Sequence, residues 1–509
     1  MGKKYLLGID IGTSGCKIAI FDYCGKLRDS ITERYSTYFS ASGCAEQDAN
    51  DWWSAVCRGI RNLISKEQIN PSEIIGIGVD GQSWVCLPID EEGKPLCKAM
   101  IWLDRRAEKE AKWLKEGIGE ERLIQTSGNP VEPGYILPKM LWLKENKQDV
   151  YNNTCKFLQS NAYIVYKLTE KYSQDYSQAY GFHFFNISQG QWDENLAKEL
   201  SINLDMMAPL VHCHDIVGTV TTQAAKETGL LPGIPVVAGG LDAACSALGA
   251  GVIGNGETQE QAGQAGGMSI VLGRALIHPK LILGYHVIPN KWLLQGGTVG
   301  GSGILRWYNQ EFGFLEQQIA EESQRNVYEI FDEEVVEIAP GSDGLIFLPY
   351  MEGERSPVWD SHAKGVLLGL SYQKKRSQVI RSLMESVGFA LFDNINTAEE
   401  KGIVIKNLVS VGGGANSKVW TQMKSDITNK TIYVPCANYA TSLGAAILAG
   451  VGVGVYRDFN DAVRCCVKIQ RTHNPDLEKH QLYQRYFKIY KKMYLQLKEI
   501  FKEMSDLGM

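Results

Sequence analysis

The sequence predicts an α/β protein built from two similar domains. Its 509 residues are more than one typical hydrophobic core organises. A β-turn-β pattern over residues 5–22 returns in outline around Gly263–Ser269, which suggests distant duplication. The glycine-rich stretch from Gly249 to Gly256 suits a domain boundary. We therefore expect an N-terminal domain over residues 1–253 and a C-terminal domain over residues 254–509.

Composition excludes several classes of partner. With 44% hydrophobic and 22% charged residues the chain has the make-up of a soluble globular protein. A formal net charge of −6 provides no field that attracts nucleic acid. No apolar run approaches the roughly 20 residues that span a bilayer, and the N-terminus shows no signal-peptide pattern. We expect a cytoplasmic protein, with neither nucleic acid nor a membrane as partner.

The first hairpin pattern carries polar residues at its tip. Backbone N–H groups near Gly12 and Gly15, with the hydroxyls of Thr13 and Ser14, are suited to binding a phosphate. Asp10 is suited to holding Mg²⁺ directly or through water. The alternative is a tight turn whose Asp and Thr satisfy only the local backbone. The pattern alone leaves both interpretations open.

A second glycine pattern resembles a dinucleotide fingerprint but fails its test. Residues 76–81 satisfy G-x-G-x-x-G, yet residues 84–90 read as strand where the fingerprint needs a helix. We therefore reject dinucleotide binding here. Gln82, Ser83 and Trp84 instead suggest a wall for a polar small molecule, with the indole as a stacking floor. A partly buried aromatic residue is an equally weighted alternative.

Two further carboxylates follow apolar strand patterns. Asp104 comes after the strand pattern at residues 99–103 and before a charged helix pattern. It is either an N-cap or a hydrogen-bond acceptor for substrate hydroxyls. Asp242 follows an apolar run and two glycines, and small residues at helical density come after it. An acid, a base, a metal ligand and an N-cap all fit such a residue.

Two glycine-rich stretches in the C-terminal half precede helix patterns. Residues 295–307 include Gly301, and residues 408–417 include Gly413, Gly414 and Asn416. Backbone N–H groups there are able to approach a nucleotide closely, and the absence of side chains suits a flat adenine ring. A structural strand-to-helix turn is the alternative for the second stretch. The Walker A sequence is absent from the chain.

The C-terminal tail has the pattern of an amphipathic helix. Between Pro475 and Met504 it is rich in Lys and carries aromatic residues on or near one face. Aromatic stripes of this kind usually belong to a core. We expect the helix to dock on the second domain rather than on a membrane.

Several motifs, taken in chain order, resemble those of the FGGY carbohydrate kinases. The resemblance covers nearly the whole chain. It rests on Asp10-Ile-Gly-Thr-Ser14, Gly78-Val-Asp-Gly-Gln82, Trp102-Leu-Asp-Arg105, Gly239-Gly-Leu-Asp242, the run from Phe347 to Pro357, and Gly412-Gly-Gly-Ala-Asn416. A further run, Gly365–Leu370 followed by Gln378–Glu385, is close to the second signature of that family.

The resemblance implies a fold and a set of roles. The fold would be two ribonuclease-H-like (actin-like ATPase) domains hinged about a central cleft, and the reaction ATP-dependent phosphorylation of a sugar hydroxyl. Asp242 would be the general base and Asp10 the Mg²⁺ residue. The first phosphate hairpin would consist of Asp10, Thr13, Ser14 and Lys17, and the second hairpin with its neighbouring loop of Gly266, Gly267 and Gly301. The sugar would be bound by Gln82, Ser83, Trp84 and Asp104. Adenosine would be bound by Gly413, Gly414 and Asn416. Gly267 stands where the family often has Thr, so that contact would be made by backbone only.

The resemblance is greatest to the xylulokinase-like pentulose kinases. The loop Glu352–Pro357 is similar to that of xylulokinases and gluconokinases rather than glycerol kinases. Trp84 replaces a His, and Ala243 an Asn, of many xylulokinases. A ketopentose such as D-xylulose is the expected substrate, and gluconate, another ketose or a sugar alcohol is the alternative.

Two other classes of protein are the alternatives to a sugar kinase: a non-kinase actin-like ATPase and a sugar-binding paralogue. Because dimers are common in the family, a homodimer is a candidate assembly.

Overall fold

The computed structural model describes residues 4–436 and 439–507, which form two compact units. Unit 1 comprises the stretch that ends at Ile253, together with Val271–Leu294 and Tyr439–Val467. Unit 2 comprises Gly254–Ile270, the stretch that begins at Gln295, and the C-terminal stretch from Lys468. The predicted domain ranges stay a prediction. Residues 1–3, on which the signal-peptide expectation partly rests, lie outside the described residues.

Unit 1 is built on a mixed sheet in the strand order β13-β14-β5-β1-β2-β3. β1 and β2 form the predicted first hairpin, and β5 lies parallel to β1 on its other side. The short β15 also pairs with β5. The strands are β1 (Tyr5–Ile11), β2 (Gly15–Asp22), β3 (Leu27–Arg34), β5 (Ile74–Gly81), β13 (Ile216–Thr219), β14 (Pro235–Val237) and β15 (Gly240–Leu241).

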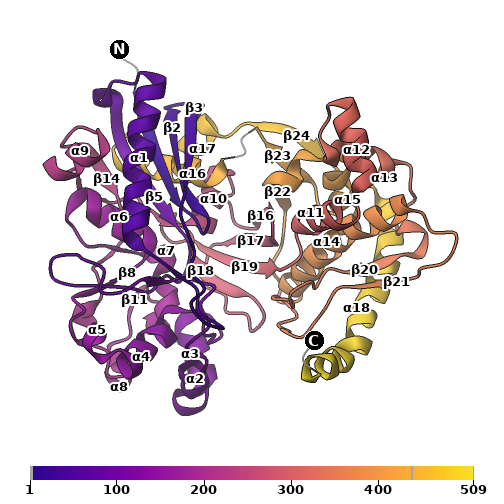
Figure 1. Ribbon diagram of the computed structural model, residues 1–509, viewed down its shortest axis with the longest axis horizontal. Helices are drawn as coiled ribbons and strands as arrows, with labels where there is room; N and C mark the ends of the chain where they lie inside the picture. The colour runs from indigo at the N-terminus through magenta and orange to yellow at the C-terminus, as the bar shows by residue number, and fades with distance from the viewer. Residues whose placement is uncertain (1–3, 437–438, 508–509) are drawn as a thin grey trace. The chain divides into compact units, whose positions relative to one another are not determined.

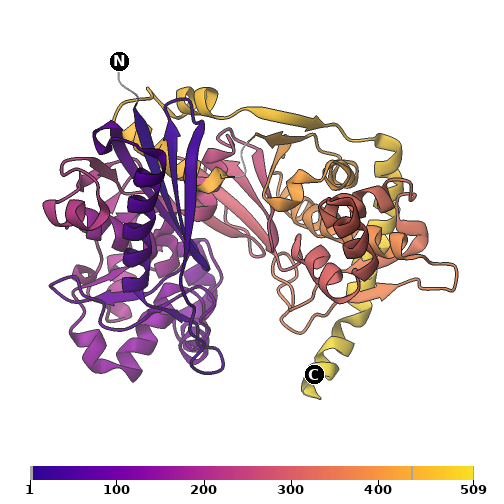
Figure 2. The ribbon, with the colours of Figure 1, turned by 45° about the horizontal axis from the view of Figure 1, so that its top comes forward.

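Helices that are distant in the sequence cover this sheet (Figure 1). α1 (Ala49–Glu67) packs on β2 and β3, α6 (Ser160–Thr169) on β5, and α9 (Thr222–Thr228) on α1. α10 (Asp242–Gly249) packs on α16 (Ala440–Gly452), which contacts both β1 and β5. Both views show the orange α16 beside the indigo strands (Figures 1 and 2), and α17 (Phe459–Cys466) packs against it. A late stretch of the chain therefore completes the unit that the N-terminus begins.

Local sequence explains α1. The Asp48 side chain accepts a hydrogen bond from the N–H of Asn50 and so caps the helix, and Gln68 ends it in a left-handed conformation (φ 50°). Trp52, Val56 and Ile60 recur at helical spacing and are all buried. The face that they form is the one that packs on the sheet.

Two glycines in the sheet allow α16 to approach closely. A Cβ on Gly8 would lie 2.1 Å from the carbonyl oxygen of Ser442, and one on Gly78 would lie 1.9 Å from that of Ala445. Residues 76–81 lie within β5, and no helix opens at Gly81. The helix that a dinucleotide fingerprint needs is thus missing after Gly81, as predicted, and Gly78 serves the packing of a helix against a strand.

A smaller part of unit 1 is formed mainly by residues between β5 and α10, with β4 from before β5. Its strands are β4 (Glu46–Gln47), β6 (Leu87–Ile89), β7 (Ala99–Met100), β8 (Lys156–Leu158), β9 (Gln174–Asp175), β10 (Phe185–Asn186), β11 (Gln191–Trp192), β12 (Leu210–Val211) and, from the later stretch, β18 (Ile282–Tyr285). Its helices are α2 (Glu108–Trp113), α3 (Glu120–Ser127), α4 (Ile136–Asn146), α5 (Gln148–Asn152), α7 (Tyr176–Ala179) and α8 (Glu194–Glu199).

Unit 2 repeats the core of unit 1. β16 and β17 form an antiparallel hairpin, and β22 lies parallel to β16, as β5 does to β1. The strand order continues to β23 and β24. The strands are β16 (Glu257–Ala262), β17 (Gly266–Leu272), β19 (Trp292–Thr298), β20 (Ile346–Leu348), β21 (Val366–Leu368), β22 (Asn407–Val411), β23 (Ile432–Pro435) and β24 (Ile469–His473). The predicted repeat of the hairpin is confirmed.

The helices of unit 2 include the predicted C-terminal one. They are α11 (Gly303–Glu311), α12 (Phe314–Ser323), α13 (Val327–Val336), α14 (Arg376–Glu399), α15 (Lys418–Thr428) and α18 (Leu477–Asp506). α18, yellow in Figure 1, packs against α15 and β20. Tyr483, Tyr490 and Phe501 are buried. The expectation that this helix docks on the second domain is confirmed. Within the part of the chain that the structure describes, no helix combines the length and apolar character needed to cross a membrane.

Candidate active site

The tip of the β1–β2 hairpin holds Asp10 and Thr13. Asp10 pairs with Lys17 across the hairpin. The Tyr35 hydroxyl donates a hydrogen bond to the carbonyl of Gly12, and Gln47 Nε2 donates one to the carbonyl of Thr13 at 2.7 Å. These two hydrogen bonds fix the carbonyl groups of Gly12 and Thr13. The turn of the hairpin is therefore rigid and polar, as a phosphate site requires.

Gln82 connects the hairpin to the following wall. It is buried, its Nε2 donates to Gln47 Oε1 at 2.8 Å, and its Oε1 accepts from the Thr13 hydroxyl at 3.4 Å. Trp102 Nε1 donates to the same hydroxyl at 3.0 Å. The structure therefore brings the predicted phosphate residue Thr13 and the predicted sugar residue Gln82 into one network. Gln47 and Trp102 complete it, and neither stood out in the sequence as a site residue.

Trp84 stacks within an aromatic cluster of unit 1. Its ring lies 4.0 Å from that of Tyr135, nearly parallel, and Tyr180 meets both rings edge-on at 6.4 Å. Trp84 is half-buried and adopts φ 56°, in the left-handed region. Lys139 Nζ donates to the carbonyls of Trp84 at 2.9 Å and Ile101 at 2.7 Å, which ties the two segments together. Burial lowers the pKa of Lys139 to about 7.

Asp104 is buried and already has protein donors. The Ala45 N–H donates to it at 2.7 Å, and the Arg106 guanidinium donates through Nε at 2.9 Å and Nη2 at 2.7 Å. α2 begins later, with Ala107 at its N-cap position, so Asp104 does not cap it. The carboxylate orients Arg106, which also donates to Glu46. A role for Asp104 in sugar binding stays a prediction.

Asp242 is the first residue of α10, and Leu241 stands at the N-cap position. Its Oδ1 accepts a hydrogen bond from the N–H of Ala243 at 2.6 Å. The preceding N–H, that of Leu241, donates to the Ser177 hydroxyl at 2.8 Å, and this hydroxyl donates to buried Asp175 at 2.5 Å. Asp175 and Ser177 thus position the strand end from which Asp242 projects. Neither residue belongs to a local sequence pattern that indicates a chemical role.

Three carboxyls of unit 1 interact electrostatically. Burial raises the pKa of Asp10, although the adjacent Asp80 carboxyl and the charge of Lys17 lower it. Burial, and then the charges of Asp10 and Asp242, hold the pKa of Asp80 well above its usual range. Burial, with a contribution from Asp10, raises the pKa of Asp242 to about 7. A carboxylate with a pKa near neutrality is suited to act as a general base.

The second predicted hairpin site lies in unit 2, where glycines are required for packing. A Cβ on Gly267 would lie 2.9 Å from the carbonyl oxygen of Gly296, and one on Gly266 would lie 2.6 Å from Thr298 Oγ1. A Cβ on Gly301 would approach the carbonyl carbon of Ala265 to 2.4 Å. The hairpin and the loop before α11 therefore meet backbone to backbone. No space remains at Gly267 for the Thr that the family often carries.

A cavity of about 490 Å³ in unit 2 contains the predicted adenosine residues. Gly413, Gly414 and Asn416 line it, together with Ser302, Tyr328 and other residues of α11, α13 and α15. A Cβ on Gly413 would meet no atom within 4 Å, whereas one on Gly414 would lie 2.5 Å from Ser302 Oγ. Gly413 therefore faces open space, and Gly414 is a packing residue.

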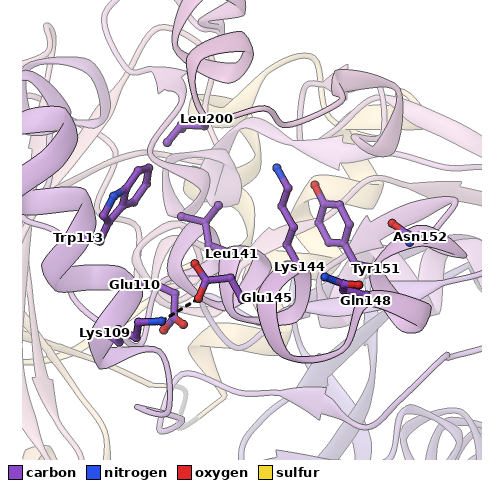
Figure 3. A pocket seen from close by; sticks show the side chains of 10 residues that line it. All are labelled: Lys109, Glu110, Trp113, Leu141, Lys144, Glu145, Gln148, Tyr151, Asn152 and Leu200. Atoms are coloured by element: carbon purple, nitrogen blue, oxygen red, sulfur yellow. Dashed lines mark hydrogen bonds and ion pairs between the residues drawn. The ribbon is translucent and has the colours of Figure 1, made fainter.

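A second hollow, of about 850 Å³, lies in unit 1 away from the predicted site residues (Figure 3). α2, α4 and α5 line it, with Trp113 and Leu141 among its apolar residues and an ion pair between Lys109 and Glu145 (3.1 Å) at one side. None of the predicted sugar, phosphate or base residues contributes to this hollow.

The fold matches that of a solved carbohydrate kinase. The structure of a ligand-bound xylulose kinase from Lactobacillus acidophilus superposes with a TM-score of 0.90 over 98% of this chain and all of that one, at 23% sequence identity. Together with the hairpin that each unit contains, this likeness defines a two-domain α/β fold of the carbohydrate-kinase type.

The family follows from the sequence comparison. The model of the FGGY family of carbohydrate kinases matches with its N-terminal domain over residues 5–249 and its C-terminal domain over residues 275–453. The chain belongs to this family, and it is an ATP-dependent carbohydrate kinase.

Two curated relatives differ in the sugar that they are named for. A xylulose kinase of Staphylococcus epidermidis is 32% identical over 506 residues, 98% of each chain. A gluconokinase of Bacillus subtilis is 29% identical over 475 residues, 93% of this chain and 92% of that one. Such similar identities leave the sugar to be decided by the site.

Proposed function

We propose that the enzyme phosphorylates a hydroxyl of a ketopentose such as D-xylulose, with Asp242 as general base. The observation that carries the proposal is the placement of Asp242 at the start of α10, close enough to Asp10 that the charge of Asp10 contributes to its raised pKa. At neutral pH such a carboxylate is partly deprotonated. It is able to take the proton of a sugar hydroxyl as the hydroxyl attacks the γ-phosphate.

The hairpin of unit 1 fits a divalent cation. Asp10 is a carboxylate near the end of β1, at the tip of the hairpin. Mg²⁺ favours such carboxylate oxygens while retaining several waters. When bound, it would neutralise phosphate charge as the phosphoryl group is transferred. Thr13, Ser14 and Lys17 would then bind the phosphate.

The sugar wall consists of Gln82, Ser83 and Trp84, with Asp104 and its partner Arg106 beside it. The ring of Trp84, stacked on that of Tyr135, would offer the sugar an apolar surface. The buried amide of Gln82 would offer the sugar a polar contact at a fixed position. A flat apolar surface with few polar groups around it suits a sugar with a short polyol chain. D-Gluconate is the second candidate, favoured by the gluconokinase relative.

The nucleotide is assigned to the cavity of unit 2. Gly413 presents backbone to open space there, and Asn416 lines the same cavity. These features suit a flat base with its ribose. Gly266, Gly267 and Gly301 would contact phosphate through backbone N–H groups only.

A cytoplasmic location and a homodimer are further proposals, and size-exclusion chromatography with light scattering tests the homodimer.

A substrate panel tests the proposal. ADP release is measured with MgATP and each of D-xylulose, D-ribulose, D-gluconate, D-arabitol and glycerol. We expect the highest kcat/KM with D-xylulose. A highest value with D-gluconate would move the substrate to the hexonates. ATP hydrolysis indifferent to every sugar would favour the ATPase alternative and remove the proposed function.

A further inference from the structure

Asp80 is a buried carboxylate without a protein donor. It lies on β5 directly across from Asp10 on β1, and its side chain is fully buried. Among the residues that the structure describes, no N–H or O–H group donates a hydrogen bond to either of its oxygens. Its carboxyl lies against that of Asp10. Nothing in the reaction as described above uses this residue.

Two other buried carboxylates, one in each unit, have donors. Asp175 accepts hydrogen bonds from Ser177, from Asn161 at 3.0 Å and from the N–H of Gln178 at 3.1 Å. In unit 2, Glu260 accepts from Lys424 at 2.7 Å. An unpaired buried carboxylate is costly, because burial removes its hydration without replacement. Asp80 therefore needs a bound proton or a bound cation.

The neighbour of Asp80 favours a cation. Two adjacent carboxylates repel each other when both are ionised, and a divalent cation between them reverses the sign of that interaction. Mg²⁺ is typically bound through one or two carboxylates, with waters and phosphate oxygens as its remaining ligands. Within residues 4–436 and 439–507 no group of three or more Asp, Glu, His or Cys residues is arranged to hold a metal. Asp10 and Asp80, paired across β1 and β5, provide two carboxylates for such an ion.

We propose that Asp80 is a second carboxylate of the divalent-cation site, binding Mg²⁺ together with Asp10, directly or through a water of the ion. The inference rests on the proposed function in that it takes the hairpin of unit 1 as the cation site. It assigns a role to the middle residue of Gly78-Val-Asp-Gly-Gln82. It also explains why a carboxylate is present on β5 where no protein donor meets it.

The test measures metal binding without turnover. Mn²⁺ alone is titrated into the full-length enzyme at pH 7, and free Mn²⁺ is measured by electron paramagnetic resonance. We expect Asp80→Asn to weaken Mn²⁺ binding by about tenfold or more, because one ligand charge is lost. The matched control is Glu110→Gln. Glu110 is also buried with one oxygen lacking a donor, but it lies at the hollow of Figure 3. This control is expected to bind Mn²⁺ as the wild type does.

Thermal unfolding of the metal-free enzyme separates a metal role from a structural one. An amide in place of the Asp80 carboxylate is able to donate to Asp10, so Asp80→Asn is expected to raise Tm while lowering Mn²⁺ affinity. Asp80→Ser provides a second, smaller variant if the first does not fold.

Either of two results overturns the proposal. One is Mn²⁺ affinity within twofold of wild type in the folded Asp80 variant, and the other is wild-type enzyme without a saturable Mn²⁺ site. The sugar panel is independent of this result. Wild-type enzyme that turns over sugar while Asp80→Asn binds Mn²⁺ normally removes only the role of Asp80. Wild-type enzyme without sugar-dependent turnover removes the proposed function.

Discussion

The hairpins of the two units share a backbone pattern and differ in chemistry. In unit 1, Asp10 pairs with Lys17 across the hairpin, and in unit 2 the corresponding pair is Gln261 with Gly267. The parallel neighbour of Asp10 is Asp80, whereas that of Gln261 is Val411. One copy therefore carries charge where the other carries an amide, a glycine and an apolar residue. In our account, unit 1 holds the cation and the base, and unit 2 provides backbone and a cavity.

Two buried carboxylates, Glu385 and Asp80, differ in the number of their hydrogen-bond donors. Glu385 of unit 2 is buried and accepts hydrogen bonds from Arg381, Tyr483, the Ser342 hydroxyl and the N–H of Gly341. Such a fully paired group stabilises a fold. In unit 1, the oxygens of Asp80 accept no hydrogen bond from any residue that the structure describes. Acidic groups left without donors are more informative about function than acidic groups in networks.

The largest expected effect is that of removing the base in unit 1. Asp242→Ala should lower kcat by a factor of about 10² to 10⁴, because no other side chain replaces the proton acceptor. Sugar affinity, measured by calorimetry, should remain within a few fold. Asp193→Ala removes a carboxylate that caps α8 and serves as the control, with kcat expected to be unchanged. Near-normal turnover by Asp242→Ala would remove Asp242 from the mechanism.

A smaller effect is expected in the cavity of unit 2. Gly413→Val places its side chain in open space, so the enzyme should fold normally while ADP binds roughly tenfold more weakly, a loss of about 1.4 kcal/mol. Gly414→Val is the contrasting variant, because its Cβ would clash with Ser302, and Tm should fall. Calorimetry and thermal unfolding measure the two effects. Unchanged ADP affinity in Gly413→Val would place the nucleotide elsewhere.

The smallest effect concerns the altered hairpin of unit 2. Gly267→Thr restores the residue that the family often carries, but its Cβ would lie 2.9 Å from the carbonyl of Gly296. We expect a loss of about 1–3 kcal/mol in the free energy of unfolding. Denaturant unfolding measures this loss, and ATP affinity should not improve. A variant with wild-type stability and tighter ATP binding would show that the hairpin accommodates a side-chain phosphate contact.

Much of the architecture could be predicted because its signals are local. The hairpin at residues 5–22, the placement of Asp242 at a strand-to-helix turn and the amphipathic tail each depend on residues near in sequence. The rejection of a dinucleotide site depended on residues 76–90 alone. Periodicity and turn chemistry are sufficient for such features.

What could not be predicted depends on distant pairing. The contact of Asp80 with Asp10 follows from the register of two strands that lie about 70 residues apart, which periodicity does not determine. The stack of Trp84 on Tyr135 and the hold of Arg106 on Asp104 are tertiary contacts of the same kind. Likewise, no local pattern indicated that α16 would pack on β1.

The pH dependence of kcat/KM for the sugar tests the central claim most directly, because it reports ionisations of the free enzyme. Burial, with a contribution from Asp10, raises the pKa of Asp242 to about 7, and the base must be deprotonated to act. We predict that kcat/KM falls about tenfold per pH unit below pH 7 and is level above it, and that this limb disappears in Asp242→Ala. A wild-type profile that is level from about pH 5.5 to pH 8 would contradict the assignment of Asp242 as the base.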